Sequence, residues 1–269
     1  MLTRTVTGFF FILVLVGAIL AGVYTFTALF TLIALFSLLE FYHIINQKQK
    51  PNVPVGLLLS ISLILGIVQD IFSLDLPGIY YFSYLFVIGL FLLELYRKSD
   101  QAFTNIGLSI LGIIYTIVPF ISFILLGFLA GSFNPWLPLG FLIMLWSNDT
   151  GAYLSGKFLG KHKLFERHSP KKTWQGFVGG ILLALISAAV IAHYQTLYPL
   201  HIWLICAGII GVFGTYGDLI ESMLKRSYGI KDSGKILPGH GGLLDRFDGL
   251  LLAAPCVYIF LKFLNYNFF

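Results

Sequence analysis

The feature of this sequence that most constrains its fold is a series of long apolar runs that recurs from one end to the other. Residues 7–23 and 106–128, for example, contain no charged residue. Only 11% of the 269 residues are charged, whereas a typical soluble domain has about 25%. A run of about 20 apolar residues can cross a bilayer as a helix. We therefore expect an all-α polytopic integral membrane protein rather than a membrane β-barrel, whose strands would alternate over about ten residues.

The apolar runs predict about nine transmembrane helices. The stretch 7–45 is divided near Gly22, because one helix over it would be about twice as long as the hydrocarbon core is thick. The predicted spans lie near 7–23, 26–45, 55–72, 79–96, 106–128, 136–156, 176–193, 200–218 and 249–266. We expect residues 1–100 to form N-terminal transmembrane helices, and residues 101–269 to form a C-terminal catalytic transmembrane domain with cytoplasmic loops.

The positions of the basic residues support this arrangement of spans. With nine helices, one face carries the N-terminus and the segments near 46–54, 97–105, 157–175 and 219–248. These segments hold all of the 17 Lys and Arg residues except Lys262, and the loops on the opposite face hold none. The positive-inside rule therefore places the N-terminus and the long loops in the cytoplasm. A compact chain without long tails favours a multi-pass protein of a bacterial plasma membrane.

Polar residues near the ends of spans form three clusters, and the first is WSNDTGAYLSGKFLGKHK at 146–163. A charged side chain within a span costs roughly 2.5–3.5 kcal/mol on insertion scales, so it needs a partner or a function. Asn148 and Asp149 lie within the predicted sixth span, followed by several small residues. Close helix packing would account for the small residues but not for Asp149, which we expect to be functional.

The second cluster is HSPKKTWQGFVGG at 168–180. Ser169 or Thr173 can cap the helix that follows, and Lys171 and Lys172 lie beside its N-terminus. Free backbone N–H groups at a helix N-terminus favour the binding of phosphate. The alternative interpretation is an ordinary positive-inside loop that contacts lipid headgroups without specificity.

The third cluster is GDLIESMLKRSYGIKDSGKILPGHGGLLDRFDG at 217–249. Asp218 and Glu221 are three residues apart, as are Asp245 and Asp248, so each pair shares one face if helical. Carboxylates are the hard ligands that Mg²⁺ prefers, and glycine-rich turns bring backbone N–H groups close to phosphate oxygens. Lys and Arg neutralise charge that develops on a transferred phosphoryl group. The three clusters together predict phosphoryl or nucleotidyl transfer at the cytoplasmic surface of the membrane.

The segment SMLKRSYGIKDSGKILPGHGGLLDRFD, residues 222–248, resembles the signature of phosphatidate cytidylyltransferases, also called CDP-diacylglycerol synthases. NDTGAY and SPKKTWQGF resemble upstream blocks of the same family, so the resemblance covers about 140–250. It implies a multi-spanning homodimeric enzyme that converts CTP and phosphatidate to CDP-diacylglycerol and pyrophosphate. It also implies Mg²⁺ as cofactor, with the choice between one and two metal ions left open. The expected partners are the two substrates and the lipid bilayer, with no nucleic acid.

The resemblance and the side-chain chemistry together give the expected site. The expected catalytic residues are Asp218, Asp245, Lys171 and Lys172. The resemblance implies Asp218 and Asp245 as metal ligands, and Asp149 and Asp248 are further candidate ligands. The expected substrate-binding residues are Ser169, Thr173, Lys225, Arg226, Lys231, His240, Gly241, Gly242 and Arg246. The sequence does not decide which of Lys171 and Lys172 contacts phosphate. We expect Asp149, Asp218 and Asp245 to share a single pocket.

Three other functions are compatible with parts of the sequence. A CTP-dependent lipid or polyprenol kinase would use the same nucleotide but would release CDP. A CDP-alcohol phosphatidyltransferase has a DxxDG pattern that Asp245, Asp248 and Gly249 imitate, but no carboxylate follows Asp248 to complete it. A transporter or scaffold would have intramembrane charges along a midplane pathway. Here the charges gather at one predicted face, which favours the transferase.

Overall fold

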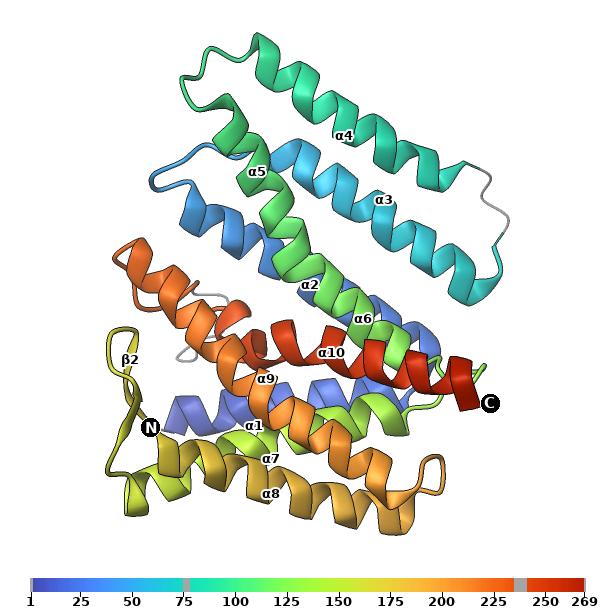
Figure 1. Ribbon diagram of the computed structural model, residues 1–269. Coiled ribbons are helices and arrows are strands. Elements are labelled where there is room, and N and C mark those ends of the chain that lie inside the picture. Colours follow the sequence, from blue (N-terminus) through green and yellow to red (C-terminus); the bar gives the residue numbers. More distant parts are fainter. Residues whose placement is uncertain (1, 75–77, 235–240, 269) are drawn as a thin grey trace.

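The computed structural model describes residues 2–74, 78–234 and 241–268, and side chains within these ranges from residue 6 to 265 (Figure 1). The described chain is almost entirely helical, as the sequence predicts. Its helices are α1 (Leu2–Leu20), α2 (Val23–Ile45), α3 (Val53–Phe72), α4 (Ile79–Tyr96), α5 (Ala102–Gly112), the π-helical turn η1 (Ile113–Ile117), α6 (Val118–Leu126), α7 (Trp136–Leu159), α8 (Trp174–Tyr194), α9 (Leu200–Ser227) and α10 (Leu244–Phe268). Two short strands, β1 (Lys163–Phe165) and β2 (Ser169–Thr173), lie between α7 and α8.

Within the described ranges, seven helical stretches are long and apolar enough to cross a membrane. They are α2, α3, α4, the continuous helix from α5 to α6, α8, α9 and the part of α10 up to Asn265. The apolar part of α1, Val6–Leu20, is shorter, and α7 is not among the seven. The count of nine spans therefore stays a prediction. The division near Gly22 is confirmed, because this residue separates α1 from α2 with a φ of 122°.

Two segments that the sequence predicts to be loops contain regular structure. The helix α9 continues nine residues beyond the predicted end at 218, to Ser227. Polar contacts one turn apart support this extension, since Ser222 donates to Asp218 and Lys225 donates to Glu221. In the predicted loop 157–175, β1 and β2 form an antiparallel pair with Lys163 opposite Thr173. Charge marked both segments as cytoplasmic, but it did not indicate their local structure.

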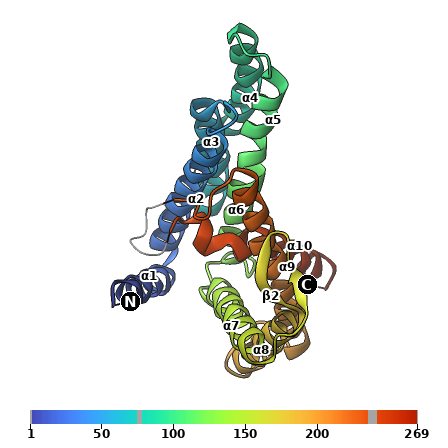
Figure 2. The same ribbon diagram turned by 90° about the vertical axis from the view of Figure 1, so that its left-hand side faces the viewer.

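The helices form two groups that α2, α6 and α10 connect (Figures 1 and 2). In one group α3 packs against α4, and in the other α7, α8 and α9 pack together. Between them, Phe30 and Phe120 from α2 and α6 pack around Phe247 of α10. Helix α2 thus contacts α6 and α10, across the boundary expected at residue 100. That boundary stays a prediction.

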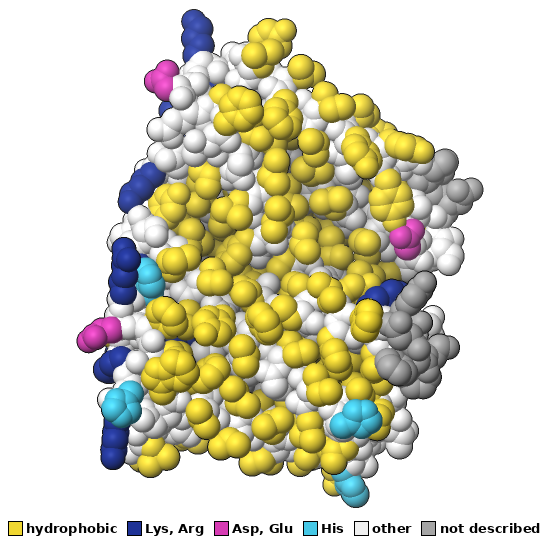
Figure 3. Space-filling view, in the orientation of Figure 1, with side chains coloured by type: hydrophobic (Ala, Val, Ile, Leu, Met, Phe, Trp, Pro, Cys, Tyr) yellow, Lys and Arg dark blue, Asp and Glu magenta, His cyan; other side chains and the backbone are white. Residues whose placement is uncertain are grey.

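Most of the charged side chains on the face seen in Figure 3 lie along one edge, although basic and acidic side chains are also visible toward the opposite edge. Lys and Arg side chains line the edge where the α4–α5 connection, the C-terminal end of α9 and the β1–β2 hairpin lie. Hydrophobic side chains cover most of the surface between this edge and the opposite one. This separation of charge from apolar surface agrees with the one-sided distribution of basic residues in the sequence.

Candidate active site

A cavity of about 410 Å³ lies where α7, the β1–β2 hairpin, α8 and α9 meet. Its lining combines two carboxylates with three cations and several apolar side chains. The lining residues are Asn148, Asp149, Ala152, Tyr153, Gly156, Lys157, Leu164, Lys171, Lys172, Thr173, Gly176, Phe177, Thr215 and Asp218. A cavity with this lining can receive a polyanion on its cations while its carboxylates hold a positive ion. We call it the polar cavity.

Close packing of α7 on α8 gives the polar cavity two of its walls. A Cβ added to Gly151 would lie 2.6 Å from the carbonyl oxygen of Gly179, so the two backbones are almost in contact. The small residues of the first sequence cluster therefore serve helix packing, as the alternative interpretation proposed. Thr173 caps α8 by accepting a hydrogen bond of 3.1 Å from the N–H of Gly176. Of the two capping candidates, Thr173 is the cap, and Ser169 begins β2 instead.

An ion pair between β2 and α9 lies in the polar cavity. Lys172 Nζ lies 2.7 Å from Asp218 Oδ2 and donates to the carbonyl oxygen of Thr215 at 3.3 Å. The other carboxylate oxygen of Asp218 accepts from Ser222 at 3.2 Å. The two paired side chains keep 24% and 39% of their surface exposed. A ligand that enters the cavity can therefore reach both of them.

Further carboxylates lie beside Asp218, where α10 approaches α9. A Cβ added to Gly217 would overlap the backbone oxygen of Asp248, so only glycine permits this approach. Asp248 is partly buried and lies within electrostatic range of Asp218, Glu221 and Asp149. Glu221 is 1% exposed, and its Oε1 has no hydrogen-bond partner among the described residues. Helices α7 and α9 thus place three carboxylates, those of Asp149, Asp218 and Glu221, within electrostatic range of Asp248 in the first turns of α10.

Asp245 lies next to this group but is not among the residues that line the polar cavity. Its Oδ1 accepts a 2.6 Å hydrogen bond from Lys225, which also donates to Glu221 at 2.6 Å. Its Oδ2 accepts from the N–H and Oγ of Ser233 at 2.9 and 3.0 Å, and from the N–H of Gly242 at 2.8 Å. The expected shared pocket therefore holds Asp149 and Asp218, while Asp245 holds the start of α10.

The other expected substrate-binding residues lie outside the polar cavity or outside the described ranges. Arg226 donates to the carbonyl oxygen of Ile230 at 3.0 Å, and its side chain is exposed, as are those of Lys231 and Arg246. Gly241 has a φ of 83° and lies against Asp245. His240 lies outside the described residues. The substrate contacts expected for these residues stay predictions.

Two polar residues near this region are not among the predicted site residues. Tyr115, on η1, has a buried hydroxyl without a described partner, within electrostatic range of Glu221, Asp248 and Asp218. Its position inside an apolar run gave no signal, and a π-helical turn cannot be read from the sequence. Glu40, on α2, contacts the start of α10. Because it is a carboxylate inside a predicted span, the criterion that selected Asp149 could also have selected Glu40.

The donor set can be tested against the expected metal. No group of three or more His, Cys, Asp or Glu side chains in the described ranges is arranged to hold a metal ion. Two carboxylates, Asp149 and Asp218, do line the polar cavity. Mg²⁺ is commonly held by one or two protein carboxylates, with substrate phosphates and water completing its octahedron. The cavity therefore fits Mg²⁺ bound together with a phosphate ligand rather than a cage made by protein alone.

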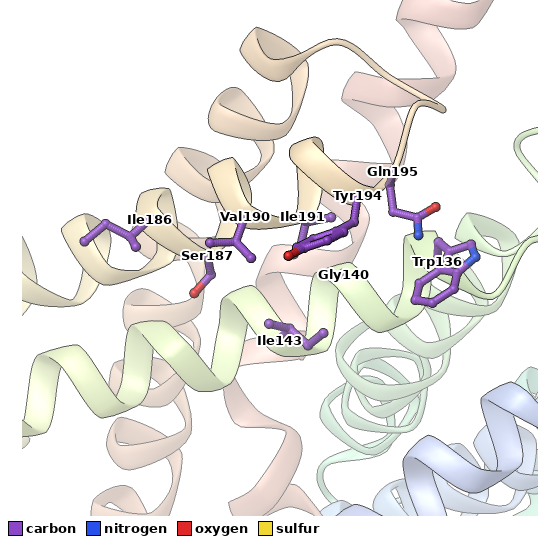
Figure 4. A pocket seen from close by; sticks show the side chains of 9 residues that line it. All are labelled: Trp136, Gly140, Ile143, Ile186, Ser187, Val190, Ile191, Tyr194 and Gln195. Atoms are coloured by element: carbon purple, nitrogen blue, oxygen red, sulfur yellow. The ribbon is translucent and has the colours of Figure 1, made fainter.

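A second cavity, of about 600 Å³, lies between the other ends of α7 and α8 (Figure 4). Trp136, Ile143 and Ile186 contribute to its walls, and no Asp, Glu, Lys or Arg among the described residues does. Ser187, also in its lining, donates to Ser147 at 2.7 Å. Such a lining suits an apolar chain but offers a polyanion no charge partner. The polar cavity is therefore the better candidate active site.

Residues 2–264 match the sequence model of the cytidylyltransferase family, and the chain belongs to that family. Among curated proteins, the phosphatidate cytidylyltransferase of Bacillus subtilis (strain 168) is 50% identical over 120 residues, which are 44% of this chain and 45% of that protein. The phosphatidate cytidylyltransferase of Staphylococcus haemolyticus (strain JCSC1435) is 47% identical over 121 residues, 44% of this chain and 46% of that protein. The similar segment thus spans less than half the length of these relatives.

Proposed function

We propose that this protein transfers the cytidylyl group of CTP to phosphatidate, giving CDP-diacylglycerol and pyrophosphate, in the polar cavity. The observation that carries the proposal is the ion pair of Lys172 and Asp218 inside that cavity, beside Asp149. Cations and carboxylates at one opening suit a reaction between two polyanions, in which repulsion is the main obstacle. Family membership and the printed names of the bacterial relatives support the same reaction.

The residues of the cavity would bring the reactants together. A phosphate oxygen of phosphatidate forms a bond to the α-phosphorus of CTP, and the bond from that phosphorus to pyrophosphate breaks, so the electron pair leaves with pyrophosphate. Phosphatidate is already anionic at neutral pH, so the attack needs no strong general base. Lys171 and Lys172 line the cavity and would neutralise the phosphates. Holding the two reactants in contact would supply much of the rate enhancement.

Asp149 and Asp218 are the residues that would hold Mg²⁺, because both present carboxylates to the cavity. When bound, Mg²⁺ would reduce the negative charge of the triphosphate and so ease the approach of a second anion. Lys172 already neutralises Asp218 and would have to share that carboxylate with the ion. Ligand roles for Asp245 and Asp248, and a second metal ion, stay predictions.

We infer that the cavity faces the cytoplasm of a bacterial plasma membrane. The basic edge of the molecule supports this orientation through the positive-inside rule. CTP would enter from water, and phosphatidate would enter sideways from the inner leaflet. Exposed Tyr153, which lines the cavity, would offer apolar surface for its acyl chains, as would exposed Phe158 and Trp174, which follow the lining residues Lys157 and Thr173 in the sequence. The homodimer that the sequence resemblance implies is part of the same proposal.

The reaction can be distinguished from its alternatives by its products. Purified full-length protein in detergent receives Mg²⁺, phosphatidate and CTP labelled in the cytosine ring, with phosphatidate omitted as the control. The proposal predicts release of pyrophosphate and transfer of the cytosine label into the lipid phase. Release of CDP with phosphorylated lipid would instead indicate a CTP-dependent kinase. Absence of turnover would favour a transporter or scaffold.

A further inference from the structure

Glu40 makes contacts that the reaction alone does not explain. It lies near the C-terminal end of α2, and its side chain is 5% exposed. Its Oε1 accepts from the N–H of Leu243 at 2.9 Å, and its Oε2 accepts from the N–H of Leu244 at 2.9 Å. Oε2 also accepts from the hydroxyl of Ser233 at 3.1 Å. One carboxylate of the N-terminal half thus binds three donors of residues 233–244, which we call the glycine-rich segment.

These bonds make Glu40 the cap of α10. The first N–H groups of a helix have no partner within the helix, and a nearby Ser, Thr, Asp or Asn usually accepts from them. Here the acceptor comes from a helix more than 200 residues earlier in the chain. A carboxylate is well suited to this position because it also interacts favourably with the positive end of the helix dipole.

Glu40 also holds the two described ends of the glycine-rich segment together. In sequence, Ser233 precedes residues 235–240, and Leu243 follows them. A Cβ added to Gly234 or Gly242 would overlap the carboxylate of Glu40, so both glycines permit the close approach. The hydroxyl of Ser233 is shared between Glu40 and Asp245, at 3.1 and 3.0 Å. The contacts of Glu40 therefore continue directly into those of Asp245.

The same contacts change the role expected for the backbone of this segment. The N–H groups of Leu243 and Leu244 donate hydrogen bonds to Glu40, and the N–H of Gly242 donates to Asp245. A carboxylate at the start of α10 also opposes the binding of an anion there. The triphosphate therefore has its better place in the polar cavity, and the start of α10 supplies orientation.

We propose that Glu40 is a positioning residue for cytidylyl transfer, so this inference rests on the proposed function. By fixing the first turn of α10, Glu40 sets the place of Asp245 against Lys225 and of Asp248 beside Asp218. Glu40 acts through Ser233 and the helix N-terminus and does not touch the substrate. The active site formed by the C-terminal half would thus depend on a side chain from the N-terminal half.

A matched control exists in the N-terminal half of the chain. Glu94, on α4, is 1% exposed and accepts a 2.6 Å hydrogen bond from Asn105. It also lies 3.4 Å from Arg97. Because Asn105 belongs to α5, the contacts of Glu94 join α4 to α5. Replacement of either glutamate by glutamine removes a buried charge of the same chemistry. Of these two glutamates, Glu40 contacts the start of α10, whereas the described contacts of Glu94 are with Asn105 and Arg97.

The test compares Glu40→Gln with Glu94→Gln in the full-length protein. Glutamine keeps one acceptor oxygen but turns an NH₂ group toward backbone donors. Glu40→Gln should lower kcat about 10- to 100-fold, the range typical of residues that orient a metal site. It should also speed amide hydrogen exchange at Leu243 and Leu244. Both variants should lower Tm by a similar amount, because each loses a buried charge. Glu94→Gln should nevertheless leave kcat and the exchange at Leu243 and Leu244 unchanged. Glu40→Asp, which keeps the charge, should recover part of the rate.

Equal losses of kcat in Glu40→Gln and Glu94→Gln at equal Tm would overturn the proposal, and so would an unchanged kcat in Glu40→Gln. If Glu40→Gln does not fold, Ser233→Ala removes a single donor and should still lower kcat. The double variant with Ser233→Ala and Glu40→Asp should lose a smaller factor in kcat than the product of the two single losses, because both substitutions act on one contact. Simple multiplication of the effects would contradict the proposal. An inactive wild type would refute the proposed function, whereas hydrogen exchange would still decide whether Glu40 holds α10.

Discussion

Lys225 and Asp245 form an ion pair of 2.6 Å that joins the last turns of α9 to the first turn of α10. Lys225 also contacts Glu221, one turn earlier on α9. A second ion pair, between Lys172 and Asp218, joins the middle of the same helix to β2. Helix α9 thus connects the polar cavity with the start of α10.

Lys172 should contribute more to activity than Lys171. Both line the polar cavity, but Lys172 holds Asp218 at 2.7 Å. Lys172→Ala should lower kcat about 100- to 1,000-fold, the loss found when one preorganised donor that stabilises developing negative charge is removed. Lys172→Arg should retain more activity. Steady-state kinetics with both lysine variants provides the test, and a larger loss in Lys171→Ala would reverse this assignment.

Asp149→Asn and Asp218→Asn should each reduce turnover to a small residual rate and leave the amount of protein in the membrane intact. Each replacement removes one of the two carboxylates that line the cavity. Residual activity should require a higher Mg²⁺ concentration, which a Mg²⁺ titration of the rate measures. Asp70→Asn is the matched control, because Asp70 contacts Tyr80 on the paired helices α3 and α4. A wild-type rate in either test variant would remove that residue from the expected metal site.

Asp245→Asn should abolish turnover and also destabilise the protein. The substitution removes the charge that faces Lys225, and these side chains are only 8% and 11% exposed. We expect a loss of about 1–3 kcal/mol, because Lys225, a buried charged donor, loses one of its two carboxylate partners. Thermal unfolding in detergent measures the change. Exposed Asp232 in the same segment is the control, since Asp232→Asn should change stability by about 0.5 kcal/mol or less. An Asp245→Asn protein with normal stability would contradict the structural role.

Cysteine labelling should reveal the orientation of the chain. Lys161→Cys lies beside the hairpin at the basic edge, and Ser132→Cys lies between α6 and α7; both positions are exposed. A membrane-impermeant maleimide added to intact cells should label Ser132→Cys and spare Lys161→Cys until the cells are opened. The protein without either substitution controls for labelling of Cys256 and Cys206. The opposite pattern would place the polar cavity outside the cell.

The helical architecture could be predicted because apolar runs and charge asymmetry are local properties of the sequence. Gly22 marked the first turn correctly, since a single helix there would exceed the bilayer. The predicted end of α9 near 218 was wrong, because contacts along the helix, such as that of Lys225 with Glu221, extend it beyond the apolar run. The β1–β2 hairpin was missed because its short strands carry the same charges as a loop.

The site could be predicted in part. Asp149, Asp218, Lys171 and Lys172 lie together, as the three sequence clusters suggested. The separate position of Asp245 could not be read from spacing, because it depends on Lys225 and Ser233, 20 and 12 residues away. The contact of Glu40 with the start of α10 was missed for a similar reason, although its place inside a predicted span could have marked the residue itself. Its partners lie near the other end of the chain, and a single sequence gives no signal of that contact.

The most direct test of the central claim is a structure of the full-length protein with CTP and Mg²⁺. The account predicts the triphosphate in the polar cavity, within hydrogen-bond distance of Lys172 Nζ, with a metal ion between it and the carboxylates of Asp149 and Asp218. A triphosphate bound instead at the start of α10, to the N–H groups that now donate hydrogen bonds to Glu40 and Asp245, would contradict it.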